Sequence, residues 1–108
     1  MASGSIVQFR PNIGFSFEQL IVTTAVQVLT PTKYAGSDPF EEASTAFLSL
    51  DGGDIRYTYD GTTPSATVGH ILSNGGALVL TGQNQIKQFK CFKYGNDNST
   101  ISITYERE

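Results

Sequence analysis

The side chains best suited to nucleophilic or acid–base chemistry are few in this sequence, and they form no recognised catalytic pattern. The only histidine is His70, and a hydrolytic triad would need it between a carboxylate and an activated nucleophile. Serines and acids are numerous, but the G-x-S-x-G pattern of a nucleophile elbow is absent. We therefore expect His70 to be a structural or interface residue.

Paired carboxylates could serve glycoside hydrolysis, which places two acids on either side of the scissile bond. The candidate acids all fall in predicted turns, and they are Asp51 with Asp54, Glu41 with Glu42, and Asp60 or Asp97. Aspartate before glycine is typical of tight turns, since its side chain bonds the local backbone. We therefore expect turn chemistry at these positions and no enzymatic activity.

Metal and cofactor sites are not predicted either. Cys91 is the only cysteine, so the chain can form neither an internal disulfide nor a cysteine-based metal site. The segments 51–54 (DGGD) and 95–98 (GNDN) carry oxygen ligands, but their spacing departs from the calcium-loop pattern. The phosphate-binding patterns GxxxxGK[ST] and GxGxxG are absent as well.

Nucleic-acid binding is opposed by the formal net charge of −3, because nucleic-acid binders usually carry a basic patch. Three lysines do alternate with aromatic residues, as on a single-strand binding platform, namely Lys87, Lys90 and Lys93 with Phe89, Phe92 and Tyr94. On a strand, however, Lys90 faces the opposite side from Lys87 and Lys93. We therefore expect no nucleic-acid partner.

The composition indicates one small β domain. The chain has 108 residues, of which 39% are hydrophobic and only 16% are charged, whereas soluble domains average roughly 25% charged residues. Residues such as Thr, Ser, Gly and Asn take the place of charge, and they suit half-exposed strands and tight turns. The first residues lack the pattern of a signal peptide, and no apolar run could span a membrane. We expect a soluble protein that is made in a cytoplasm and has no membrane partner.

The expected strands follow one another at short intervals. Residues 19–29 are rich in β-branched side chains and predict a long strand that is central or buried on both faces and is ended by Thr30-Pro31. Residues 31–43 predict a loop with one helical turn from Asp38. Further strands are predicted at the alternating segments 44–50, 55–59, 77–81, 86–94 and 99–105. The turn at 51–54 predicts that 44–50 and 55–59 form a hairpin.

This pattern predicts an all-β fold, a single-domain antiparallel β-sandwich or barrel-like fold with an N-terminal arm. We divide the chain into residues 1–18, an arm or closing strand, and residues 19–108, the sandwich domain. The arm is unusually apolar, and its candidate interface residues are Phe9, Ile13, Phe15 and Phe17. Two interpretations stay open, because the segment could close the sheet over the core or pack against a partner subunit.

Residues 54–105 carry a series of short motifs whose order and spacing match a known group of proteins. The motifs are Tyr59-Asp60-Gly61-Thr62-Thr63-Pro64, Gly69-His70-x-Leu72, Gly75-Gly76 before Leu78-x-Leu80, Ile86-x-x-Phe89 and Ile101-x-Ile103-x-Tyr105. This half of the chain resembles small proteins encoded among the virion genes of tailed bacteriophages. The half up to Asp51 does not contribute to the resemblance.

The resemblance implies a non-enzymatic structural protein of the virion, made in the host cytoplasm. The leading hypothesis is a capsid decoration (cement) protein, a homo-oligomer with a trimer favoured, that stabilises the head by binding the major capsid protein. One alternative is a tail, neck or fibre-attachment component that binds other virion proteins. Another alternative is a carbohydrate-binding β-sandwich module that uses surface tyrosines, although the sequence lacks the tryptophan that such sites favour.

Overall fold

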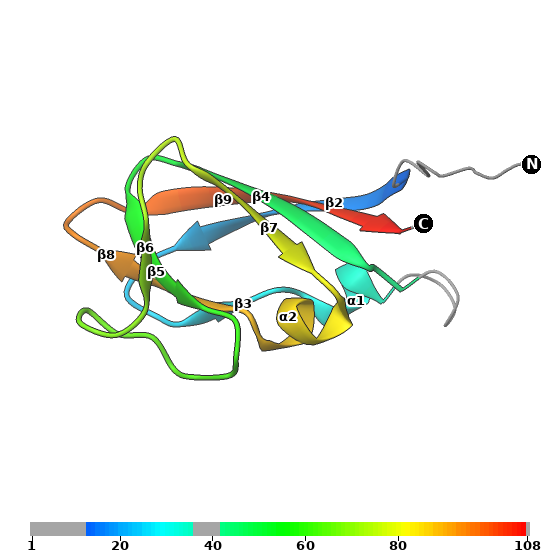
Figure 1. The fold of residues 1–108 in the computed structure, drawn as a ribbon. Helices are drawn as coiled ribbons and strands as arrows, with labels where there is room; N and C mark the ends of the chain where they lie inside the picture. The colour runs from blue at the N-terminus through cyan, green and yellow to red at the C-terminus, as the bar shows by residue number, and fades with distance from the viewer. Residues whose placement is uncertain (1–12, 36–41, 108) are drawn as a thin grey trace, which may run out of the picture.

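The computed structural model describes residues 13–35 and 42–107, which form two antiparallel sheets packed face to face (Figure 1). The first sheet has the order β2 (Ile13–Val22), β9 (Ser99–Arg107), β4 (Thr45–Asp51) and β7 (Ala77–Thr81). The second sheet has the order β3 (Gln27–Val28), β8 (Lys90–Tyr94), β5 (Asp54–Thr58) and β6 (His70–Leu72). Two short helices, α1 (Pro31–Tyr34) and α2 (Gln83–Gln88), complete the fold. The prediction of an antiparallel β-sandwich is confirmed.

The core lies between the sheets and follows the alternation of the strands. In β4 the side chains of Ala46, Leu48 and Leu50 are buried, and in β9 the side chains of Ile101 and Ile103 are fully buried. The second sheet contributes other buried side chains to the same cluster, among them Ile55, Phe89 and Cys91. Since every second residue of a strand faces the same side, the burial of these residues agrees with the alternation that predicts strands at 44–50 and 99–105.

The predicted hairpin between 44–50 and 55–59 is wrong. β4 pairs with β9 and β7, whereas β5 pairs with β8 and β6. The turn between them therefore carries the chain from one layer to the other, with Gly52 at a positive φ of 104°. Both arrangements need one apolar face on each strand, so the alternation alone does not distinguish a hairpin from a crossing between sheets.

The single long strand predicted for residues 19–29 is also wrong. β2 ends at Val22, and the chain then crosses through residues 23–26 to the short strand β3 in the second sheet. β2 is an edge strand and is not buried on both faces, because the Ile21 side chain is 63% exposed. The apolar residues of 19–29 therefore lie in two environments. Val22 and Leu29 are buried in the core, whereas Ile21 lies on the surface.

Two segments contain helices that the sequence did not predict. Pro31 begins α1 within the predicted loop 31–43, where its fixed φ suits the first turn of a helix; the helical turn predicted at Asp38 lies outside the described residues. α2 occupies part of the strand predicted for 86–94, so β8 starts only at Lys90. Ile86 and Phe89 are both buried, and their separation of three residues is the helical spacing for one face.

The N-terminal part of β2 is tied to the sandwich. Residues 13–18, which the sequence assigns to an arm or closing strand, continue directly into the rest of β2 and pair with β9 across a bulge between Gly14 and Ser16. The Glu18 side chain points inward, and its carboxylate accepts hydrogen bonds from the Thr30 N–H (3.1 Å), the Thr30 hydroxyl (2.7 Å) and the Tyr105 hydroxyl (2.5 Å). Thr30 follows β3, so these bonds join the first sheet to the chain leaving the second.

Removing the Tyr105 hydroxyl tests this connection. A buried carboxylate that loses a donor keeps part of its desolvation cost, so Tyr105→Phe should lower the free energy of unfolding by about 1–3 kcal/mol, measured by urea denaturation. Tyr94→Phe is the matched control, since the Tyr94 hydroxyl makes no hydrogen bond within the described residues. A double-mutant cycle with Glu18→Gln should show coupling, and additive losses would contradict the proposed connection.

The buried thiol of Cys91 predicts a loss of stability at alkaline pH. Burial raises the pKa of Cys91 from its usual 9.0 to about 12, so the unfolded chain loses this proton at lower pH than the folded protein. The contribution of the protonated Cys91 thiol to the free energy of unfolding is complete below pH 9 and is lost as the pH rises towards 12. Between these values the wild type should lose up to about 1.4 kcal/mol per pH unit more than Cys91→Ala. Parallel curves of unfolding free energy against pH for the two proteins would show that the thiol ionises equally in both states.

Candidate binding surfaces

The first candidate surface is the outer face of the first sheet, where three exposed apolar side chains lie in one cross-strand row. The register pairs Phe17 of β2 with Thr104 of β9, Thr104 with Phe47 of β4, and Phe47 with Val79 of β7. Phe17 is 54% exposed, Phe47 43% and Val79 51%. We call Phe17, Thr104, Phe47 and Val79 the outer apolar row. It crosses all four strands of the sheet.

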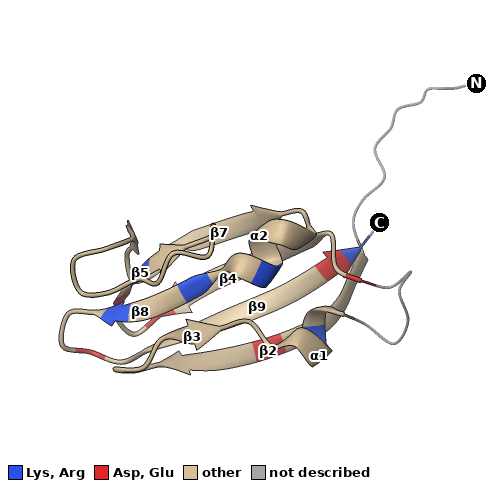
Figure 2. Ribbon diagram, turned by 90° about the horizontal axis from the view of Figure 1, so that it is seen from below, with Lys and Arg blue, Asp and Glu red and all other residues tan. Residues whose placement is uncertain are grey.

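The next row along this face is polar and uncharged. The register aligns Gln19 of β2, Ser102 of β9, Ser49 of β4 and Ala77 of β7, and the Gln19 side chain donates a hydrogen bond to the Ser102 hydroxyl (3.0 Å). The first-sheet strands carry few charged residues, which Figure 2 colours red and blue. Glu18 is buried, and the others are Asp51 at the end of β4 and Glu106 and Arg107 at the end of β9. The face therefore offers apolar and neutral polar contacts and little charge to desolvate.

The structure separates the four interface residues that the sequence predicts. Ile13 and Phe17 are exposed. Phe15 is only partly exposed and packs against the core, with the Arg107 guanidinium 5.4 Å from its ring centroid. Phe9 lies outside the described residues. Sequence reasoning missed Phe47 and Val79, although each is an apolar residue at an outward position of an otherwise polar strand face, and that signal could have identified them.

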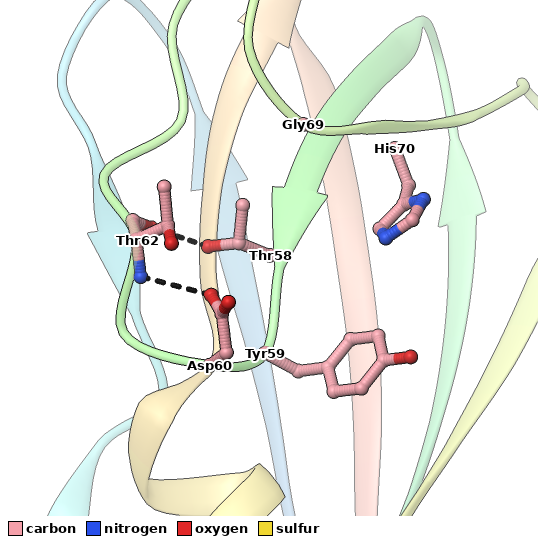
Figure 3. A pocket seen from close by; sticks show the side chains of 6 residues that line it. All are labelled: Thr58, Tyr59, Asp60, Thr62, Gly69 and His70. Carbon is pink, nitrogen blue, oxygen red and sulfur yellow. Dashed lines mark hydrogen bonds between the residues drawn. The ribbon is translucent and has the colours of Figure 1, made fainter.

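The second candidate surface is a pocket of about 430 Å³ at one end of the second sheet (Figure 3). It is lined by the end of β5, the turn after it and the start of β6, and its residues are Thr58, Tyr59, Asp60, Thr62, Gly69 and His70. Pairing of β5 with β6 places Tyr57 opposite His70. Residues 59–62 and 69–70, which are separated in sequence, therefore share one site.

The aromatic side of the pocket is continuous with the core. The Phe89 ring is fully buried and stacks with the Tyr57 ring, with centroids 6.0 Å apart. Tyr57 contacts His70 at 5.4 Å, and His70 stacks with Tyr59 at 6.0 Å and an interplanar angle of 22°. We call Phe89, Tyr57, His70 and Tyr59 the aromatic ladder. Because it begins in the close-packed interior, the position of the exposed Tyr59 ring is well supported.

The polar side of the pocket is a hydrogen-bonded turn. The Asp60 carboxylate accepts a bond from the Thr62 N–H (3.0 Å), and the Thr58 hydroxyl donates to the Thr62 carbonyl oxygen. The bonds from Thr62 lower the pKa of Asp60, and the nearby His70 lowers it slightly more. Asp60 therefore presents a negative charge at neutral pH. In Figure 3 the His70 ring lies next to the Tyr59 ring, on the other side of the end of β5 from Asp60 and Thr62.

The other candidate site residues are dispersed. Lys87 lies on α2 and forms an ion pair with Glu42 (3.1 Å), and Phe89 beside it is buried. The described residues thus do not reproduce the predicted alternation of lysines and aromatic residues on one strand. Asp54 accepts a hydrogen bond from the Asn74 N–H (2.8 Å), as expected for an acid in a turn.

The turns at 51–54 and 95–98, which carry possible calcium ligands, lie against each other. A Cβ atom on Gly53 would come within 2.7 Å of the Asp97 carbonyl oxygen. Even so, no group of three or more His, Cys, Asp or Glu side chains within residues 13–35 and 42–107 could hold a metal ion. The contact between these turns is therefore one of backbone packing.

Fold and site together define an antiparallel β-sandwich with exposed apolar side chains on the outer face of one sheet and a separate aromatic pocket. No protein-family model matches the chain, and no curated protein or solved structure is significantly similar to it. Neither of the helices in the described part of the chain is long and apolar enough to cross a membrane.

Proposed function

We propose that the protein is a non-enzymatic structural component of a virion, and that it binds other virion proteins through the outer apolar row. The observation that carries the proposal is the alignment of Phe17, Phe47 and Val79 on the exposed face of the first sheet. Exposed apolar side chains that gather on one face of a domain are typical of an interaction surface. The resemblance of residues 54–105 to small phage proteins supports the virion setting.

The specific role that we propose is that of a capsid decoration protein, which binds the major capsid protein and stabilises the head. Such a protein must cover a wide surface between capsid subunits, and a specific interface buries about 800 Å² on each partner. The outer face of a four-stranded sheet supplies a broad contact surface, and most of its side chains are neutral, which limits the cost of burying unpaired charges. The same face also suits contacts between copies in the proposed homotrimer.

The test replaces the apolar side chains of the row without weakening the strands. Threonine keeps a high preference for β-strands, so the double variant Phe17→Thr, Phe47→Thr should fold. Full burial of a Phe side chain contributes about 1.5–3 kcal/mol, so losing two such contacts should weaken binding at least about 100-fold. The measurement is co-sedimentation with heads assembled from the major capsid protein of the virion to which we propose the protein belongs.

Ile71→Thr is the matched control, because Ile71 is 49% exposed on the second sheet and lies in register with Arg56 instead of a core residue. It should bind heads as the wild type does.

Light scattering of the wild-type protein should also show a homo-oligomer. A strict monomer with no affinity for the heads would refute the proposal, as would a double variant that binds them normally. Binding to isolated tails but not to heads would replace the decoration role by a tail or neck role.

A further inference from the structure

We propose that the pocket formed by Tyr59, Asp60, Thr62 and His70 binds a sugar ring of a neutral glycan. This site is independent of the proposed virion contacts, since the pocket belongs to the second sheet and the outer apolar row to the first. A particle-bound copy could thus keep the pocket open to a glycan.

The first argument is the exposed and supported aromatic ring. Tyr59 is 41% exposed, and it stacks on His70, which contacts Tyr57 and through it the buried Phe89. Aromatic rings combine a large apolar face with a negative quadrupole, and the C–H bonds on one face of a sugar ring can pack against such a surface. A ring held by the core loses little conformational freedom on binding, which lowers the cost of capturing a ligand.

The second argument is the mixture of hydrogen-bonding groups at the pocket. The Asp60 carboxylate is an acceptor, the Tyr59 hydroxyl both donates and accepts, and the His70 ring carries two nitrogens that can take part in hydrogen bonds. Within the described residues, Tyr59 and His70 use none of these groups in hydrogen bonds to other side chains or backbone. Sugar hydroxyls also both donate and accept, so they match this mixture of groups.

Charge argues against the other small-ligand classes. The Asp60 carboxylate repels an anion, so phosphate or sulfate groups do not suit the pocket. A cation would be attracted by Asp60 and by the Tyr59 ring, but it has no acceptor for the donors of Tyr59 and His70. The volume of about 430 Å³ falls within the range of roughly 300–1,000 Å³ that is typical of ligand pockets. A neutral, polyhydroxylated ring fits these conditions best.

The test is a titration of the full ¹⁵N-labelled protein with neutral oligosaccharides, followed by backbone amide shifts. The probes are cellohexaose, maltohexaose, xylohexaose, mannohexaose and chitohexaose, with hexalysine as the cationic comparison. We expect saturable shifts at Asp60, Thr62 and His70 with at least one oligosaccharide. The proposal is overturned if all five give no saturable shift there, or if only hexalysine does.

Variants of the pocket sharpen the result. Tyr59→Ala should weaken binding of the active oligosaccharide at least about tenfold, equal to about 1.4 kcal/mol, and Tyr59→Phe, which keeps the ring, should weaken it less. Asp60→Asn keeps an oxygen for the Thr62 N–H and so preserves the turn, but it should also weaken binding. Ile71→Ala is the control on the opposite face of β6 and should bind normally.

Head binding separates this proposal from the proposed function. The pocket variants should co-sediment with heads as the wild type does, and the variant Phe17→Thr, Phe47→Thr should bind the oligosaccharide normally. Normal glycan binding by Tyr59→Ala would overturn the assignment of the site, whatever the outcome for the heads.

Discussion

The buried Glu18 carboxylate is the interaction on which the arrangement of the first sheet and its outer apolar row depends most directly. It accepts hydrogen bonds from Thr30 and Tyr105, and a buried carboxylate without such donors would be strongly destabilising. Because side chains alternate along a strand, holding Glu18 inward keeps Phe17 and Gln19 outward in β2. A slip of one residue would bury Phe17 and remove it from the outer apolar row. The same bonds hold Thr30 against the first sheet, and so fix the path of the chain between the two layers.

In the second sheet, hydrogen bonds from one side chain position the loop that lines the pocket. The loop between β5 and β6 returns over the sheet because the Arg56 guanidinium donates hydrogen bonds to the carbonyl oxygens of Ala66 (3.1 Å) and Gly69 (2.7 Å). Arg56 also lies 4.7 Å from the centre of the Tyr94 ring, so one side chain links the loop to β8. This brings His70 into register with Tyr57 and next to Tyr59. The outer row depends on strand register alone, whereas the pocket depends on a loop held by side chains.

The sequence predicts which residues within a strand are buried better than it predicts which strands pair with each other. The alternation in 44–50 and 99–105 correctly predicts which residues of β4 and β9 are buried, since each strand has one inward face. The hairpin was wrong because the same alternation suits strands in separate sheets, and the packing of Gly53 against Asp97 that accompanies the crossing has no local signature. The partners of Glu18 are equally hidden, because Thr30 and Tyr105 are 12 and 87 residues away. Tyr59 and His70 both belong to motifs that the sequence analysis names. Only the pairing of β5 with β6 shows that they line one pocket.

The edges of the first sheet explain why we assign binding to its face. An exposed edge strand can pair with a strand of another chain, and proteins oppose this with bulges, inward-pointing charges and short strands. β2 has two of these features, the bulge between Gly14 and Ser16 and the inward charge of Glu18. The other edge strand, β7, has only five residues, and the N–H of its last residue, Thr81, donates to the Gln85 side chain of α2 (2.8 Å). With both edges poorly suited to strand addition, the exposed apolar residues of this sheet are left to make contacts through side chains. Such contacts favour a partner that packs flat against the outer apolar row over one that extends the sheet.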